Sequence, residues 1–341
     1  AIDGETGRPV DDWGKFLAAA ERMAELLEYQ AAAGAMVTVY ADGTPLWPSR
    51  VHAGGVHWDN GQIATPGRYV SSPDRSNSKD LLELLCRVFG REGLELVPAI
   101  ECSGPLASLE MLRLRGGSTA VGIECVGADG EPPAGADGGF CYNVLDPRVQ
   151  DAVEQLVIDL ADRVADRAAV RGLALACPHD GWFHLPGVAW GLDDATMARF
   201  MSDTGIEMPT AGSGRFAERA ELVSGSVKDA WLEWRCGQIA AFHSRLADAV
   251  AAHAGTIDLQ IVPTTLFSEG PLARRFRPAL TAGSGDLGLL REIGFDPQLS
   301  TAHPQIVFVR PRTHGGGAEL VAASGWRSAN HSARLAADLQ R

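Results

Sequence analysis

Three acidic side chains follow apolar segments of strand length. Glu101 and Glu124 come directly after two such segments, and Asp180 lies four residues beyond the end of a third. Hydrolysis of a glycosidic bond uses two carboxyl groups, one that protonates the leaving oxygen and one that acts as base or nucleophile. Because residues that follow parallel strands gather at one end of a barrel, we expect these three to share a site. Glu101, Glu124 and Asp180 are therefore the candidate catalytic residues.

The loops after the predicted strands also carry aromatic and imidazole side chains. Trp58, Trp182 and Trp190 lie in these loops, together with Tyr40 and His179. The apolar face of a tryptophan can cover the C–H surface of a sugar while its N–H group finds a polar partner. We therefore predict that these five residues bind substrate. Each acidic residue also has a plain structural interpretation, as a solvated side chain or as the cap of the next helix.

Motifs for other kinds of chemistry are absent from the sequence. The six cysteines include no C-x-x-C pair, and His179, Asp180 and His184 match no standard spacing of metal ligands. No G-x-G-x-x-G follows the first predicted strand, and neither a P-loop nor a G-x-S-x-G motif occurs. We therefore expect no metal ion and no cofactor.

Helical and strand patterns alternate along the chain. Residues 12–30 carry apolar side chains at i, i+3, i+4 and i+7, and Asp146 before Pro147 is a helix start with a capping carboxylate. Further helices are predicted from Ser78 to Gly93 and over residues 107–114, 193–204, 228–253, 271–277, 286–293 and 328–340. Strands are predicted over residues 35–40, 94–100, 118–123, 170–176, 257–262 and 305–309.

Most of these strands are continuous apolar runs, which are typical of parallel strands covered on both faces. Long loops follow the strands, whereas the turns that lead into them are short. This asymmetry favours an α/β fold of the (β/α)8 TIM-barrel-like kind over an open doubly wound sheet. Either two further strands lie within 42–77 or 127–142, or the barrel is incomplete at its C-terminus. We expect residues 1–341 to form one barrel-like domain.

The composition limits the classes of partner. The chain has 341 residues, of which 45% are apolar and 21% are charged, and its formal charge is −13. Such a charge repels phosphate backbones, so we expect no nucleic-acid partner. No apolar run reaches the roughly 18 residues that a membrane span needs, so no membrane insertion is expected. The chain begins at Ala1, and we expect it to be part of a longer protein. The oligomeric state is left open.

Residues 142–250 resemble the family-10-like glycosyl hydrolases, barrel proteins that include glycosyl-hydrolase-like domains of large bacterial proteins, some of them from planctomycetes. The resemblance rests on a helix start, a strand, a D-G-W-x-x-L-P-G turn, a T-G segment and a W-x-x-W-R helix that follow in the family's order. These features are, in turn, Tyr142–Val149, 170–176, Asp180–Gly187, Asp203–Gly205 and Trp231–Arg235. The resemblance implies a TIM-barrel fold and glycoside hydrolysis.

One stretch departs from the family pattern. The family's strand typically ends in D-G-I-H-F-D-D-Y, whereas this chain has Arg171–Pro178, which places Ala176 and Cys177 at the paired aspartates. Asp180 then stands as their substitute. Three hypotheses remain open: a glycoside hydrolase acting on a polysaccharide or glycan, a non-catalytic glycan-binding or interaction domain of a larger exported protein, and another barrel enzyme that uses Glu and His. An extracytoplasmic or cell-surface location is favoured by this class alone.

Overall fold

The computed structural model describes the chain at residues 13–52, 80–116, 122–133, 142–255, 257–266, 275 and 286–309. These residues form an α/β fold around one sheet of six strands in the order β2-β1-β3-β4-β5-β6. The strands are β1 (Gly34–Ala41), β2 (Thr44–Pro45), β3 (Glu95–Glu101), β4 (Gly172–Ala176), β5 (Asp258–Val262) and β6 (Ile306–Phe308).

All neighbouring strands are parallel except β2, which pairs antiparallel with β1 at the edge. The sheet is open across the described residues, so closure into an eight-stranded barrel stays a prediction.

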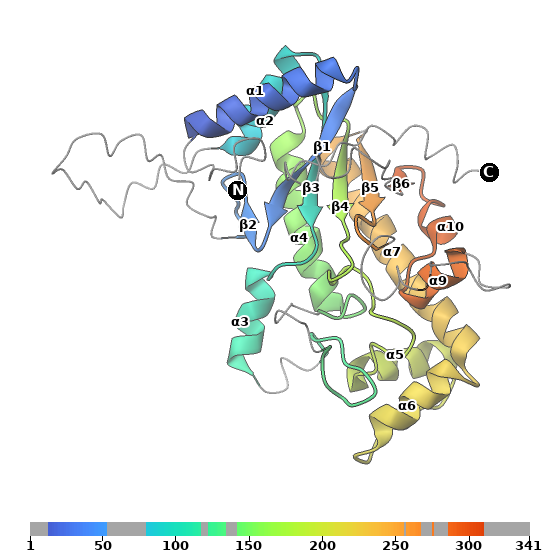
Figure 1. The fold of residues 1–341 in the computed structure, drawn as a ribbon. Helices are drawn as coiled ribbons and strands as arrows, with labels where there is room; N and C mark the ends of the chain where they lie inside the picture. Colours follow the sequence, from blue (N-terminus) through green and yellow to red (C-terminus); the bar gives the residue numbers. More distant parts are fainter. Residues whose placement is uncertain are drawn as a thin grey trace.

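The helices precede β1 or lie between successive strands in the sequence. They are α1 (Trp13–Tyr29), α2 (Leu81–Arg91), α3 (Ala107–Arg115), α4 (Pro147–Val164), α5 (Asp194–Thr204), α6 (Arg215–Ser224), α7 (Lys228–Ala254), α9 (Asp286–Glu292) and α10 (Pro297–Ser300). Helix α1 packs against α2, and α4 packs against α7. Strands β3, β4 and β5 point towards the lower half of Figure 1, where α3, α5 and α6 lie. No helix within the described ranges is both long and apolar enough to cross a membrane.

Two helix starts show how the sequence sets the element boundaries. The Asp146 side chain accepts a hydrogen bond from the Arg148 amide, and Pro147 occupies the first turn of α4, as predicted. In α2 the capping residue is Asp80, whose carboxylate accepts from the Glu83 amide at 2.8 Å. The predicted cap, Ser78, lies outside the described residues.

Each face of the sheet is covered by its own set of apolar side chains. Successive residues of a strand point to opposite faces, so Leu173 and Leu175 join the large core beneath the helices, whereas Ala174 and Ala176 face the other side. That other side, here called the inner face, carries mostly small or β-branched residues: Met36, Val97, Ala99, Ala174, Ala176, Val262 and Val309. Burial on both faces explains the continuous apolar runs in the sequence.

The predicted strand 118–123 does not lie between β3 and β4, and residues 118–121 fall outside the described part of the chain. Strand β3 pairs directly with β4, and the described part of the segment, Gly122 and Ile123, forms a turn. Three elements in the described part of the chain were not predicted: the short edge strand β2 and helices α6 and α10. The predicted helices 271–277 and 328–340 fall almost wholly outside the described residues.

His243 on α7 is a fully buried imidazole in the helical core. Its Nδ1 lies 2.9 Å from Ser300 Oγ, and its ring stacks on Phe183 with centroids 5.3 Å apart. Its Nε2 has no hydrogen-bond partner among the residues that the structure describes. Burial lowers the pKa of His243 to about 3, so the side chain is neutral in the folded protein at ordinary pH.

The free energy of unfolding should therefore fall as the pH drops below about 6.5, the ordinary histidine value. Between about pH 6.5 and about 3 the unfolded chain binds a proton that folded His243 does not, so stability is lost in this window by up to about 1.4 kcal/mol per pH unit. Urea unfolding at a series of pH values measures the slope. His243→Phe should flatten it, and His253→Gln, at an exposed histidine, should not. Equal slopes in all three proteins would contradict the assignment to His243.

Candidate functional site

Glu101 lies at the carboxyl end of β3, on the inner face of the sheet. Glu101 ends β3 and lies opposite Ala176, the last residue of β4. It has the same strand alternation as Val97 and Ala99, which both belong to the inner face. The Ser103 hydroxyl donates to Glu101 Oε1 at 3.0 Å. A half-buried carboxylate is thus oriented where barrel enzymes carry their catalytic residues, at the carboxyl end of a parallel strand.

The turn after β4 brings Asp180 beside the end of β3. The Trp182 amide donates to the Cys102 carbonyl oxygen at 2.9 Å, and a Cβ on Gly181 would lie only 2.5 Å from that oxygen. Only glycine lets the turn approach this closely. Asp180 directly precedes Gly181, and Glu101 directly precedes Cys102. Because Gly181 and Cys102 are in contact, the backbone segments that carry the two carboxyl groups lie side by side. Asp180 is exposed to solvent.

His179, in the same turn, is held by a residue that follows β5. The His179 amide donates to Thr265 Oγ1 at 2.9 Å, and His179 Nδ1 lies 3.0 Å from the same oxygen. His184 lies buried below the turn, with its ring nitrogens 2.9 Å from the Pro178 carbonyl oxygen and 3.1 Å from that of Leu185. Burial lowers the pKa of His184. The turn is therefore tied to both neighbouring strands and to the core beneath it.

The strand positions level with Glu101 carry no second acid. Ala176 pairs with both Glu101 and Val262, so these three residues form one row across β3, β4 and β5. The family's paired aspartates would fall on Ala176 and Cys177, and both are buried here. The described residues also contain no group of three or more His, Cys, Asp or Glu side chains that could hold a metal ion.

Two of the predicted sugar-binding residues lie in the core. Trp182 is 0% exposed, and its Nε1 donates to the Gly104 carbonyl at 2.8 Å. Tyr40 is also 0% exposed; its hydroxyl donates to the Pro105 carbonyl at 3.3 Å and lies 3.3 Å from His52 Nε2. Burial raises the pKa of Tyr40. The structure therefore places both rings beneath the site, and not on a surface that a sugar would touch.

Glu124 lies outside the sheet, in a network that the sequence did not reveal. It forms a single antiparallel bridge with Tyr142, and its carboxylate lies 2.6 Å from Arg113 Nη2. Arg113 also pairs with Glu110 at 2.9 Å, and the Tyr142 hydroxyl donates to Glu110 Oε1 at 2.5 Å. The Tyr142 ring contacts Trp182 edge-on, which links this network to the core below Asp180. Its only signal in the sequence is the i, i+3 spacing of Glu110 and Arg113 on a predicted helix.

The Trp190 ring packs against Gly127 and Gly187. A Cβ on Gly127 would meet its ring at 2.9 Å, and one on Gly187 would meet it at 3.6 Å. Trp190 is half-buried, so it keeps contact with solvent, whereas Trp182 does not. Trp58 lies outside the described residues.

The W-x-x-W-R motif fastens the loop that carries Trp190. Trp231 Nε1 donates to the Val188 carbonyl at 2.9 Å, and Arg235 Nη1 donates to the Gly187 carbonyl at 2.8 Å. Arg235 Nη2 donates to the Glu292 carbonyl. Arg235 is 0% exposed, and burial lowers its pKa to about 10. The motif is therefore a structural clamp from α7 onto the loop between β4 and α5.

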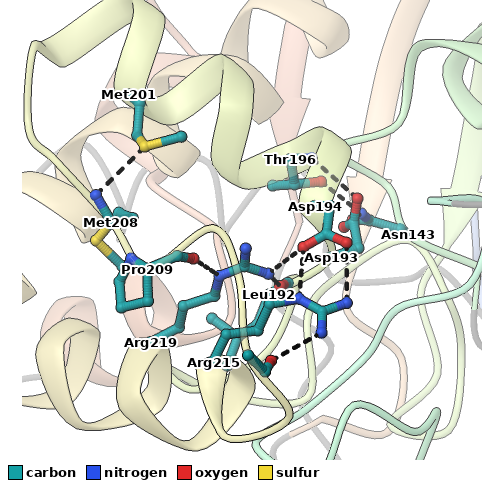
Figure 2. A network of polar contacts seen from close by, with 11 residues as sticks. Asn143, Leu192, Asp193, Asp194, Thr196, Met201, Met208, Pro209, Arg215 and Arg219 are labelled. Carbon is teal, nitrogen blue, oxygen red and sulfur yellow. Dashed lines mark hydrogen bonds and ion pairs between the residues drawn. The ribbon is translucent and has the colours of Figure 1, made fainter.

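Figure 2 shows a second buried arginine, which attaches α6 to α5. Arg219 Nη1 donates to the Leu192 carbonyl at 2.8 Å and lies 2.7 Å from Asp194 Oδ1, while its Nε donates to the Pro209 carbonyl at 2.8 Å. Arg215 binds the same aspartate through Nε and Nη2, both at 3.0 Å. This network stabilises a helical extension at the carboxyl end of the sheet.

No protein-family model matches the chain, and no curated protein matches it. Solved structures do. The glycoside hydrolase domain of PgaB (BpsB) from Bordetella bronchiseptica matches with a TM-score of 0.51 and 13% identity, over 90% of this chain and 74% of that one. The catalytic domain of β-amylase from Paenibacillus polymyxa matches with a TM-score of 0.50 and 12% identity, over 88% and 73%.

A larger enzyme, the β-galactosidase from Marinomonas ef1, matches with a TM-score of 0.46 and 12% identity over 88% of this chain. The chain spans only 39% of that β-galactosidase. The matches at TM-scores of 0.50 and 0.51 show that the α/β fold of this chain is similar to the fold of these two catalytic domains of glycoside hydrolases. At these identities the similarity concerns the fold alone.

Proposed function

We propose that this chain acts on a polysaccharide or other glycan by carboxylate acid/base chemistry, with Glu101 and Asp180 as the carboxyl pair. The observation that carries the proposal is the position of Glu101, on the inner face at the carboxyl end of β3. The contact between Gly181 and Cys102 supports Asp180 as its partner. Glycoside hydrolysis needs two such groups on opposite sides of the scissile bond.

The remaining predicted residues take supporting roles in this proposal. His179 and Trp190 contact the sugar from the loop after β4, and Trp58 contacts it from an earlier loop. Trp182 and Tyr40 stabilise the core below the site. Glu124 is a third acidic group, oriented by Arg113. The motifs at 142–250 support membership of the family-10-like glycosyl hydrolases and a barrel domain.

A hydrolysis screen of the wild type and Asp180→Asn against bacterial and algal polysaccharides tests the proposal. Turnover by the wild type that falls at least about 100-fold in the variant, the lower range for loss of a general acid or base, would support it. Equal turnover by both proteins would remove Asp180 from the mechanism. Because Asp180 is exposed, the substitution should leave the free energy of unfolding within about 0.5 kcal/mol of wild type.

A second candidate function is glycan binding without cleavage. The row Glu101, Ala176 and Val262 favours it, because a single carboxylate in this row falls short of the pair that hydrolysis needs. Calorimetric titration of the same polysaccharides distinguishes the two functions. Binding without any turnover, changed only slightly by Asp180→Asn, would support the binding function. Rapid turnover of any glycan would exclude it.

A further inference from the structure

Cys102 and Cys177 occupy equivalent positions at the carboxyl ends of two neighbouring strands. Each directly follows one residue of the pair Glu101 and Ala176, which face each other in the register of β3 and β4. The Cys102 amide donates to the Ala176 carbonyl at 2.9 Å, so the parallel ladder continues to this position. The two cysteines therefore lie opposite each other on main chains about 4.8 Å apart, the spacing of neighbouring strands.

The two thiols also have the same orientation along their strands. Cys102 Sγ donates to the Ile100 carbonyl at 3.8 Å, and Cys177 Sγ donates to the Leu175 carbonyl at 3.4 Å. Ile100 and Leu175 are themselves a pair in the register, and both cysteines belong to the large core beneath the helices. The sulfur atoms therefore lie side by side on one face of the sheet. Burial and the adjacent Cys177 thiol raise the pKa of Cys102.

This arrangement meets the geometric condition for a disulfide bond. A disulfide joins cysteines whose Cα atoms are about 4.4–6.8 Å apart, a range that includes the spacing of neighbouring strands. The structure holds both cysteines as free thiols, and each is 0% exposed. An oxidant therefore has access to them only while the chain folds or when this part of the fold opens. A disulfide reagent such as oxidised glutathione supplies the oxidising chemistry.

We propose that Cys102 and Cys177 form a disulfide that cross-links the carboxyl ends of β3 and β4 when the chain folds in the presence of oxidised glutathione. The thiolate of one cysteine attacks a sulfur of oxidised glutathione, which forms a mixed disulfide and releases one glutathione thiolate. The thiolate of the other cysteine attacks the protein sulfur of the mixed disulfide and releases the second glutathione. Two protein thiols are oxidised, one glutathione disulfide is reduced, and the released glutathione thiolates take up the two protons.

The cross-link has two consequences for the protein. It fixes the backbone that carries Glu101, and the Cys102 carbonyl is also the acceptor of the Trp182 amide in the turn after Asp180. It also closes the long loop between the two cysteines, which restricts the unfolded chain and so stabilises the folded one. Neither consequence depends on which glycan the protein binds or cleaves.

Peptide mapping of the wild type tests the pairing directly. The full chain is unfolded in urea, refolded with oxidised glutathione, treated with N-ethylmaleimide to block free thiols, and digested with trypsin without reduction. Cys102 is the single cysteine of the tryptic peptide Glu92–Arg113, and Cys177 is that of Gly172–Arg199. Mass spectrometry should find these two peptides joined. Blocked Cys102 and Cys177, or either one joined to a different cysteine, would overturn the proposal.

Urea unfolding of the same wild-type chain in its oxidised and reduced forms measures the stabilisation without any substitution. The oxidised form should unfold at a urea concentration higher by about 1 M, the usual effect of closing a long loop. Cys102→Ala should abolish the difference. Cys86→Ala, at a buried cysteine on α2, is the matched control and should keep it. Equal midpoints for the two wild-type forms would overturn the cross-link as part of the native fold, and this comparison stands even if Cys102→Ala fails to fold.

Discussion

Replacing Glu101 by glutamine is expected to lower glycan turnover by about 100- to 10,000-fold, the usual contribution of a general acid or base. Glutamine has the shape of glutamate but can neither ionise nor give up a proton. Glu101 is the one acid in the row that it forms with Ala176 and Val262, so no neighbour in that row can replace it. The Ser103 hydroxyl can still donate to the glutamine oxygen, which preserves the local structure. We expect kcat to fall and KM to change little.

Glu95→Gln is the matched control for this measurement. Glu95 starts the same strand and shares the strand alternation of Glu101, and among the described residues its side chain forms one exposed ion pair, with Arg171 at 3.3 Å. Exposed pairs contribute less than about 1 kcal/mol, so Glu95→Gln should keep the wild-type kcat. Full activity in Glu101→Gln would show that the catalytic acid lies elsewhere, whatever the effect at Asp180.

Replacing Arg235 by methionine is expected to lower the free energy of unfolding by about 3 kcal/mol or more. The guanidinium donates to the carbonyls of Gly187, Val188 and Glu292 inside the protein. The Val188 carbonyl keeps Trp231 Nε1 as a donor, whereas the Gly187 and Glu292 carbonyls lose the bond from Arg235, at about 1–3 kcal/mol for each buried carbonyl left without a donor. The desolvation that lowers the pKa of Arg235 to about 10 offsets part of this loss, because the variant no longer buries a charge. Urea unfolding monitored by tryptophan fluorescence gives the value.

Arg235→Lys should not restore stability, since a lysine lacks the planar fork that reaches several carbonyls at once. Arg171→Met provides the control: the Arg171 side chain is 62% exposed and, within the part of the chain that the structure describes, pairs with the exposed Glu95 alone, so a change of less than about 0.5 kcal/mol is expected. If Arg235→Met unfolds at the wild-type urea concentration, other groups must donate to the Gly187 and Glu292 carbonyls.

Local chemistry made much of this fold predictable. Asp146 and Pro147 set the start of α4 because a capping carboxylate and a fixed φ act within one turn. The apolar runs predicted the parallel strands because both faces of the sheet are buried. The position of Glu101 was predictable for the same reason, because a residue that ends a buried parallel strand lies at the carboxyl end of the sheet.

The failures share a different cause, since each depends on a contact between distant segments. Residues 118–123 have the composition of a strand, but Gly122 has φ +88°, and a Cβ there would lie 3.0 Å from Asp146 Oδ2 and 3.2 Å from Asp193 Oδ1. Helix α6 was missed because an ion pair between the buried Arg219 and the exposed Asp194, which lies on α5, stabilises it. Thr265 gave no signal, because only the sheet brings it to His179.

The clamp around Arg235 also bears on how the chain folds during synthesis. Strands β1, β3 and β4 can pair as soon as they leave the ribosome. The loop beyond Asp180, in contrast, depends on residues made later: Arg235 donates to its Gly187 carbonyl, and the Ile293 carbonyl accepts from its Leu185 amide. Domains emerge from the N-terminus onwards, at about 5–20 residues per second. The half of the sheet that supplies Glu101 can therefore form first, and the loop that follows Asp180 is secured only after Ile293 has been made.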